Sequence, residues 1–191
     1  VRQQNVAVMF VDIVGFTALA ARSRPDQILD LLNKLFAAFD EITARHGLEK
    51  IKTIGDCYMA AGGGFDHQGA HASAMADLAL AMQEAAARID DPDGQPVRIR
   101  IGIHVGGLTA GVIGQRRFMY DLWGDTVNIA SRMQSLGEPD CIQVSDGLRR
   151  RLDSSYRLDP RGEIDVKGKG AMSTWYLLGR DGGINAEEDV S

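Results

Sequence analysis

Val97-Arg-Ile-Arg-Ile-Gly-Ile-His-Val105 alternates apolar residues with polar residues or glycine at every step. Successive side chains of a strand point to opposite faces of its sheet, so this stretch predicts a β-strand with one buried face. Leu108 to Ile113 follows closely in the sequence and is the predicted hairpin partner of this strand. A sheet that contains this strand is therefore the first expectation for the fold.

A second strand is predicted near the start of the chain, at Val6-Ala-Val-Met-Phe-Val11. This run is almost wholly apolar, which is typical of a central strand buried on both faces. A long helix is expected from Pro25 to about His46, because apolar residues recur along it at alternating four- and three-residue steps. These residues are Ile28, Leu32, Leu35, Phe39 and Ile42.

The segments between these two strands complete the pattern. Leu48 to Ile54 and Cys57 to Ala61 are two predicted strands joined by a tight turn at Gly55-Asp56, and an alanine-rich helix is expected from His71 to Ile89. The order strand–helix–strand–strand–helix–strand predicts an α+β fold. Its core is ferredoxin-like (split βαβ), with a mainly antiparallel sheet and flanking helices.

Downstream of this core, a short helix is expected to run to about Ser135 with Asp125 as its N-cap. A strand is predicted from Ser173 to Leu178. We expect one domain over residues 1–181 and a disordered polar tail over 182–191.

Composition narrows the possible classes of protein. The chain has 191 residues, 45% of them hydrophobic, and a net charge of 21 − 26 = −5. An acidic chain without a stripe of aromatic and basic residues argues against a partner nucleic acid. Cys57 and Cys141 are too few for a disulfide scaffold, so a reducing, cytoplasmic location is expected. No run spans a bilayer, so contact with a membrane is expected only through regions outside this chain.

Two aspartates are the first candidates for chemistry. Asp12 follows the first apolar strand and Asp56 lies in the predicted hairpin turn, so both carboxylates meet at one edge if these strands are neighbours. Paired carboxylates suit Mg²⁺ or Mn²⁺ carrying a nucleotide triphosphate. Gly15 allows close approach of phosphate, and the amides of Phe16 and Thr17, where a helix begins, are candidate phosphate donors.

A second candidate group lies between residues 118 and 132. Asn128 and Arg132 stand four residues apart and share one helix face, where Arg132 offers a planar fork of donors to phosphate. Asp121 precedes this helix and can accept a proton from an amine. Spacing alone also allows an ordinary surface pair here, and it favours a solvated side chain for Lys52. Lys167 lies in a glycine-rich loop, where it is a candidate contact to a triphosphate.

Four motifs together resemble those of a class III nucleotidyl cyclase catalytic domain, and most closely the mycobacterial, mammalian-type adenylyl cyclases. They occur in the family's order and spacing over nearly the whole chain. The motifs are Phe10-Val-Asp-Ile-Val-Gly-Phe-Thr17, Lys50-Ile-Lys-Thr-Ile-Gly-Asp56, Tyr120-Asp-Leu-Trp-Gly-Asp-Thr-Val-Asn-Ile-Ala-Ser-Arg132 and Val166-Lys-Gly-Lys-Gly170.

The resemblance implies which residues bind the metal ions and which residues select the base. Asp12 and Asp56 match the aspartates that bind two divalent cations, Mg²⁺ or Mn²⁺, with the Ile13 carbonyl as a further ligand. Lys52 and Asp121 match the pair that selects adenine, where guanylyl cyclases typically place Glu and Cys. ATP is therefore the expected substrate.

The resemblance also implies how the reaction proceeds. Asn128 matches the residue that orients the ribose, Arg132 the residue that neutralises charge on the phosphoryl oxygens, and Lys167 a contact to the triphosphate. The implied reaction is attack of the ribose 3′-oxygen on the α-phosphorus, which releases pyrophosphate and 3′,5′-cyclic AMP. Some relatives place a phosphate-binding arginine where this chain has Gly107.

The implied assembly is a head-to-tail homodimer with shared active sites, because the metal ligands and the remaining site residues come from different subunits. Two alternatives remain open. A guanylyl cyclase needs a different base-selecting pair. A catalytically silent regulatory or dimerisation module is expected to have lost a metal aspartate or the Asn128–Arg132 pair, and this chain retains both.

Overall fold

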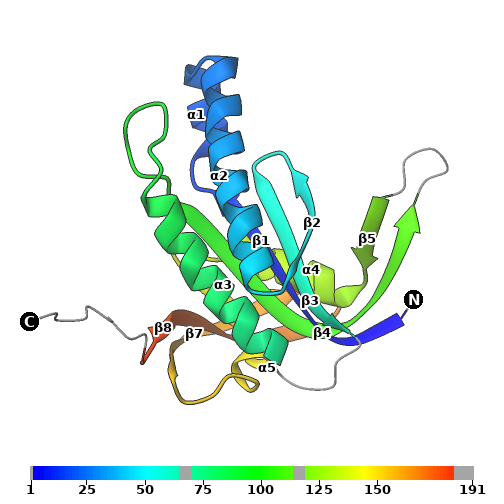
Figure 1. Ribbon diagram of the computed structural model, residues 1–191. Coiled ribbons are helices and arrows are strands. Elements are labelled where there is room, and N and C mark those ends of the chain that lie inside the picture. Colours follow the sequence, from blue (N-terminus) through cyan, green and yellow to red (C-terminus); the bar gives the residue numbers. More distant parts are fainter. Residues whose placement is uncertain (1, 65–69, 114–118, 183–191) are drawn as a thin grey trace, which may run out of the picture.

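The computed structural model describes residues 2–64, 70–113 and 119–182, and within them an eight-stranded sheet carries helices on both faces (Figure 1). The elements in chain order are β1 (Arg2–Ile13), α1 (Phe16–Arg22), α2 (Pro25–Arg45), β2 (Glu49–Ile54), β3 (Cys57–Gly64), α3 (Ala70–Ala87), β4 (Ile99–Ile113), β5 (Met119–Trp123), α4 (Asp125–Ser135), β6 (Ile142–Ser145), α5 (Asp146–Arg149), β7 (Tyr156–Val166) and β8 (Gly170–Arg180).

The strand order confirms the predicted α+β core. The sheet runs β2-β3-β1-β4-β6-β8-β7, and β5 pairs with β4 outside this path. Strand β3 lies between β2 and β1, and β1 lies between β3 and β4, which is the split βαβ arrangement. Among the described strands only β4 and β6 pair in parallel, so the sheet is mainly antiparallel as predicted.

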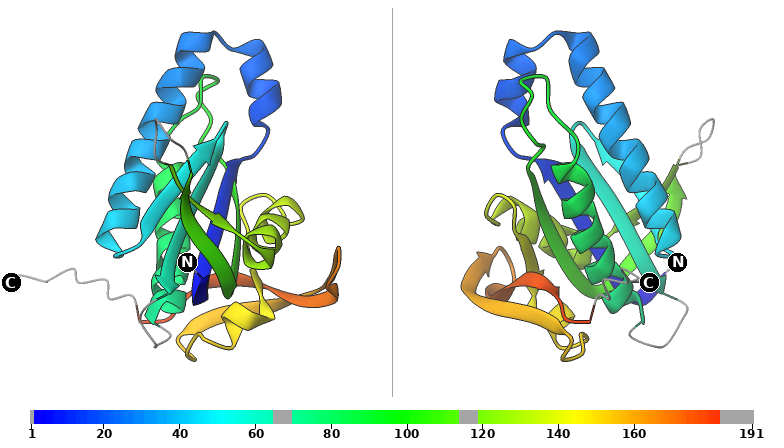
Figure 2. Two further views of the ribbon diagram at one scale, coloured as in Figure 1. Left: turned by 90° about the vertical axis from the view of Figure 1, so that its right-hand side faces the viewer. Right: turned by 60° about the vertical axis from the view of Figure 1, so that its left-hand side comes forward.

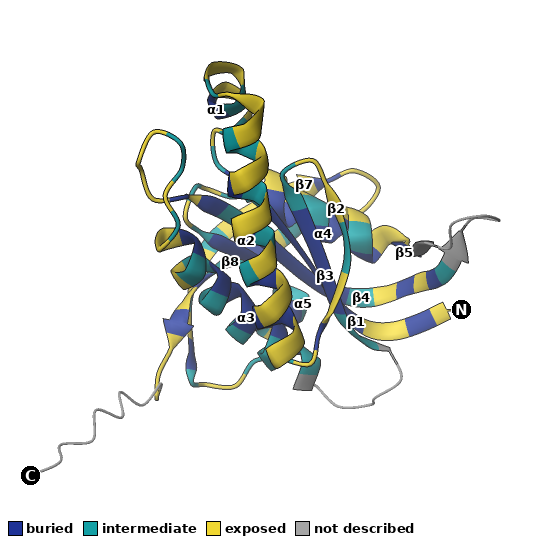
Figure 3. Cartoon of the chain, turned by 45° about the horizontal axis from the view of Figure 1, so that its top comes forward, coloured by how far each residue is buried: buried dark blue, intermediate teal, exposed yellow. Residues whose placement is uncertain are grey.

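The two faces of the sheet are covered differently. Helices α2 and α3 pack on one face, where they bury Met9 of β1 and Ile101 of β4, and α4 lies on the opposite face (Figure 2). On α2 the buried side chains, Leu35 and Phe39 among them, form one stripe while the outer side is exposed (Figure 3). No helix in the described residues is long and apolar enough to cross a membrane.

The polar face of β4 is covered as well, which the alternating sequence did not predict. Helix α4 lies directly over Gly102, where a Cβ atom would be 1.9 Å from the backbone nitrogen of Gln134. At Gly106 a Cβ would be 2.4 Å from the hydroxyl oxygen of Thr126. The two glycines therefore admit the helix, and β4 is buried on both faces where α4 covers it.

The predicted hairpin between 97–105 and 108–113 is wrong, because β4 continues without a turn from Ile99 to Ile113. Gly106 and Gly107 do not adopt the positive φ that a two-residue hairpin turn requires. Strand β5 is the antiparallel partner instead, with Gly111 opposite Asp121. This pairing brings Asp121 back beside the sheet.

Helix α4 covers the predicted residues, but its cap differs from the prediction. Gly124, with φ 129°, is the N-cap, and Asp125 is the first helical residue. The Asp125 carboxylate forms an ion pair with Lys169 at 2.9 Å rather than capping the helix. The tail predicted over 182–191 lies outside the described residues from residue 183 onward.

Candidate active site

The two predicted metal aspartates lie next to each other at one end of β1. Strand β3 runs antiparallel to β1, with Tyr58 opposite Val11, so the turn that precedes β3 lies beside the end of β1. The Ile13 amide donates a hydrogen bond to Oδ2 of Asp56 at 3.3 Å. Asp12, Ile13 and Asp56 are thus brought together as predicted.

The electrostatics of this pair favour a bound cation. Burial raises the pKa of the Asp12 carboxyl, and the negative charge of Asp56 adds to the rise. A divalent cation between the two carboxylates would offset both effects. Burial and the same two negative charges also raise the pKa of the Cys57 thiol to about 11, so this thiol stays protonated and is no nucleophile at neutral pH.

The chemistry of the donor set fits a hard divalent cation. Carboxylate and carbonyl oxygens are the ligands that Mg²⁺ and Mn²⁺ prefer. The described residues contain no group of three or more His, Cys, Asp or Glu side chains arranged to hold a metal ion. Asp12 and Asp56 would therefore share a cation with backbone, phosphate or water oxygens, which is typical of Mg²⁺ sites that bind nucleotides.

The predicted phosphate segment lies where β1 passes into α1. Gly15 has φ 71° and serves as the N-cap of α1, and no side chain caps this helix end. Phe16 packs its ring against the hydrophobic core, while Thr17 is exposed. Backbone amides, and not the Phe16 side chain, are thus the groups that this segment offers to phosphate.

Lys52 and Asp121 form an ion pair although 69 residues separate them. Lys52 Nζ lies 2.5 Å from Asp121 Oδ2, and the side chains are 32% and 11% exposed. The other carboxylate oxygen of Asp121 accepts a hydrogen bond from the Leu122 amide at 2.8 Å. The ion pair therefore holds the Lys52 ammonium group of β2 in place, and the Leu122 amide holds the Asp121 carboxylate beside it. The interpretation of Lys52 as a solvated lysine is wrong.

Asn128, Arg132 and Lys167 lie around one cavity of about 370 Å³. Asn128 and Arg132 lie on the exposed side of α4, and Lys167 comes from the turn between β7 and β8. Ser131, Ser135 and Val166 complete the lining. Two cations, one amide and two hydroxyl groups around one cavity suit a polyanionic ligand.

The structure distinguishes the two lysines of the β7–β8 turn. Lys169 forms the ion pair with Asp125, whereas within the described residues Lys167 takes part in none. The same holds for Arg132. Both free cations line the cavity, so Lys167 is the lysine available to an anion there.

Within one chain, the structure assembles three groups of predicted residues. They are the aspartate pair with the Gly15 segment, the Lys52–Asp121 pair, and the cavity lined by Asn128, Arg132 and Lys167. The lining of that cavity includes neither Asp12 nor Asp56.

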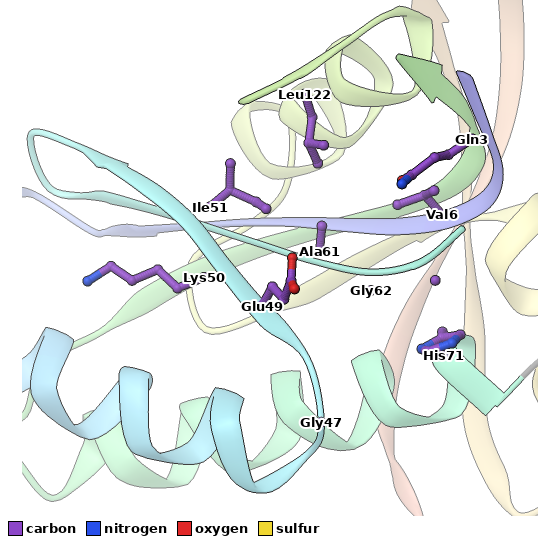
Figure 4. Close-up of a pocket in the computed structure, with 11 residues that line it drawn as sticks. Gln3, Val6, Gly47, Glu49, Lys50, Ile51, Ala61, Gly62, His71 and Leu122 are labelled. Carbon is purple, nitrogen blue, oxygen red and sulfur yellow. The ribbon is translucent and has the colours of Figure 1, made fainter. Parts of the chain in front are cut away.

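A second cavity, of about 620 Å³, lies between residues of β1, β2, β3 and β5. Ile51 and Leu122, the chain neighbours of the two charged residues, line it together with Gln3 and Val6 of β1 (Figure 4). None of the predicted site residues lines this cavity. The cavity is therefore separate from the residues that the sequence singled out.

Two residues beside Asp12 were not predicted. Arg100 lies opposite Asp12 in the β1–β4 ladder, and Gln134 reaches it from α4; both oppose the rise in its pKa. The alternating pattern of β4 placed Arg100 on a polar face but did not show which strand lay beside it. Nothing in the sequence separates Gln134 from an ordinary surface glutamine.

The sequence is similar to known cyclases along most of its length. Residues 1–179 match the family model described as the adenylate and guanylate cyclase catalytic domain. A Mycobacterium tuberculosis protein named adenylate cyclase is 48% identical over 179 residues, which is 94% of this chain and 40% of that protein. Human retinal guanylyl cyclase 1 is 45% identical over 94% of this chain and 17% of its own length.

Solved structures show the same fold. The guanylate cyclase domain of RhGC from Catenaria anguillulae, in complex with GTP, has a TM-score of 0.89 and 34% identity, covering 95% of this chain and all of that domain. The adenylyl cyclase CyaB from P. aeruginosa has a TM-score of 0.85 and 27% identity, covering 96% of this chain and 98% of that one. The chain spans about 40% of the length of its mycobacterial relatives.

Proposed function

Because the chain belongs to the adenylate and guanylate cyclase catalytic domain family, we propose that it converts ATP into 3′,5′-cyclic AMP and pyrophosphate. Relatives of both base specificities resemble it to a similar degree. The ion pair of Lys52 with Asp121 is the observation that carries the choice of ATP.

The two side chains match the hydrogen-bonding edge of adenine. Lys52 donates to N1 and Asp121 accepts from the 6-amino group. Guanine presents an N1–H donor and a 6-oxo acceptor, so it faces the wrong group at both positions. An unpaired buried polar group costs about 1–3 kcal/mol, so two mismatches disfavour GTP strongly.

Asp12, Asp56 and the Ile13 carbonyl are the proposed ligands of two divalent cations, Mg²⁺ or Mn²⁺. Bound there, the cations would lower the pKa of the ribose 3′-hydroxyl and neutralise phosphate charge. The amides of Gly15, Phe16 and Thr17 are proposed to bind phosphate oxygens at the start of α1.

The cavity beside α4 supplies the remaining groups. The proton of the 3′-hydroxyl leaves to water, and the 3′-oxygen bonds to the α-phosphorus. The bond from the α-phosphorus to the oxygen that bridges to the β-phosphorus breaks, so that pyrophosphate leaves. Asn128 is proposed to orient the ribose, and Arg132 to stabilise the negative charge that grows on the phosphoryl oxygens. Lys167 is proposed to bind the triphosphate. Because this chain has Gly107 where some relatives place a phosphate-binding arginine, phosphate binding depends more on Arg132 and Lys167.

A head-to-tail homodimer is the proposed assembly. Asp12 lies beneath the buried side of α4, whereas Asn128 and Arg132 occupy its exposed side. In such a dimer, each copy brings its Asp12–Asp56 pair to Asn128 and Arg132 of the other copy. The dimer therefore has two shared active sites. The cytoplasm is the proposed location, since ATP is the substrate and Cys57 and Cys141 are free thiols.

The function is tested by product formation from ATP and, separately, from GTP, with Mn²⁺ and then Mg²⁺, over a range of protein concentrations. We expect cyclic AMP from ATP, little cyclic GMP, and a specific activity that rises with concentration as dimers form. Preferential cyclic GMP formation would make the chain a guanylyl cyclase. No product from either nucleotide in a folded, dimeric sample would favour the regulatory module.

A further inference from the structure

Three polar residues and one glycine form a row on the face of the sheet that α4 covers. Asp12 of β1 is directly opposite Arg100 of β4, and Gly102 of β4 is directly opposite Gln143 of β6. Directly opposed residues share a face, and so do Arg100 and Gly102, which stand two residues apart on one strand. These positions therefore form one row across three strands, beneath the helix that carries Asn128 and Arg132.

Gly102 decides how close α4 comes to this row. A Cβ at Gly102 would lie 1.9 Å from the nitrogen and 2.5 Å from the Cα of Gln134, so the helix backbone rests on the strand itself. Gly102 pairs with Phe10, two residues before Asp12 on β1. Gln134 is only 6% exposed, so its side chain is enclosed between the helix and the strands next to Asp12.

Two complementary atoms remain unpaired in this space. Oδ1 of Asp12 and Nε2 of Gln134 are both buried, and neither has a hydrogen-bond partner among the described residues. A carboxylate oxygen accepts hydrogen bonds and an amide nitrogen donates them, and burying either group alone costs free energy. A side-chain amide donor of Gln134 beside this carboxylate also opposes the rise in the pKa of Asp12.

We propose that Gln134 is a positioning residue for Asp12: its side-chain amide donates to the buried Oδ1 and so leaves the other carboxylate oxygen to the divalent cation. The proposal rests on the proposed function in one respect, that Asp12 is a metal ligand. Gln134 acts through Asp12 and not on the nucleotide, because it lies on the buried side of α4, away from Asn128 and Arg132.

Replacing a residue that orients a metal ligand typically lowers metal affinity 10- to 100-fold. Gln134→Met keeps the size of the side chain and removes the amide. We expect it to weaken Mn²⁺ binding about tenfold or more while the chain stays folded. Binding is measured without nucleotide by electron paramagnetic resonance of free Mn²⁺, so neither activity nor chelation of the ion by a triphosphate enters the readout.

Gln143→Met is the matched control. Gln143 is fully buried under the same helix and its amide also has no partner among the described residues, but it lies two strands away from Asp12. We expect this variant to bind Mn²⁺ as the unchanged chain does. Thermal unfolding of each variant reports whether it is folded, and Gln134→Leu replaces Gln134→Met if the latter is not.

Two results would overturn the role of Gln134 alone. One is Mn²⁺ binding by folded Gln134→Met that equals that of the unchanged chain, and the other is an equal loss in Gln143→Met. Failure of the unchanged chain to bind Mn²⁺ would instead overturn the metal site of the proposed function, and the role of Gln134 with it.

Discussion

Asp12→Asn is expected to lower the rate of cyclic AMP formation by about 10³-fold or more, since a metal ion contributes several kcal/mol and each 1.36 kcal/mol is tenfold. Asparagine keeps the size of the side chain and removes the charge that would hold the cation. The measurement is the initial rate with saturating Mn²⁺ and ATP.

The thermal stability of this variant is not expected to fall with its activity. Burial raises the folded-state pKa of Asp12, so ionisation of this carboxyl disfavours the folded state above that pKa. Removing the charge should therefore leave the melting temperature unchanged or raise it. Asp26→Asn, on the exposed start of α2, is the control that should keep full activity. Full activity in Asp12→Asn would remove Asp12 from the metal site.

Exchanging the base-selecting pair is expected to change the preferred nucleotide. Lys52→Glu with Asp121→Cys replaces the donor by an acceptor and removes the carboxylate that faces the 6-amino group. At about 1–3 kcal/mol for each mispaired group, the ratio of kcat/KM for ATP to that for GTP should fall by at least about 30-fold. The measurement is kcat/KM for each nucleotide in the double variant.

Matched variants separate base selection from simple loss of the ion pair. Lys52→Glu alone puts two carboxylates together at a site where the Asp121 side chain is only 11% exposed, and should lower the free energy of unfolding by about 1–3 kcal/mol. Lys50→Glu lies on the same strand and breaks the exposed pair with Asp40 together with the cation–π contact to the Tyr58 ring. It should leave the nucleotide preference unchanged. An unaltered preference in the folded double variant would contradict the base-selecting role.

The sequence predicted the helices and strands whose apolar periodicity reflects burial. It did not predict features at positions where the residue type is set by a close contact with a distant part of the chain. The apolar run of β1, the helical stripe of α2 and the hairpin at Gly55-Asp56 were predicted correctly. The turn expected at Gly106-Gly107 is absent, because Gly106 serves the close approach of α4 and Gly107 that of Gln4 on β1, and neither changes the direction of the chain. Strand β7 was missed because it is a polar edge strand that contains Pro160, a residue that strands tolerate at a sheet edge or at a bulge, and both are present here.

The candidate site was predictable to a different extent for each group. Asp12 and Asp56 could be paired by reasoning about neighbouring strands alone. Lys52 and Asp121 are separated by 69 residues, and only the family resemblance joined them. Spacing does not separate Lys167 from Lys169. The family resemblance selected Lys167, and the ion pair of Lys169 with Asp125 agrees with that choice. No periodicity reports contacts of this kind.

The most direct test mixes two inactive chains. Asp12→Asn removes a metal ligand, and Arg132→Ala removes the residue that stabilises charge on the phosphoryl oxygens. In a mixed head-to-tail dimer, one shared site then contains neither substitution and the other contains both. Random pairing makes half of the dimers mixed, so activity should return to about a quarter of that of the unchanged chain. If differently tagged chains are shown to pair and no activity returns, the two halves of the site do not complete each other across the dimer.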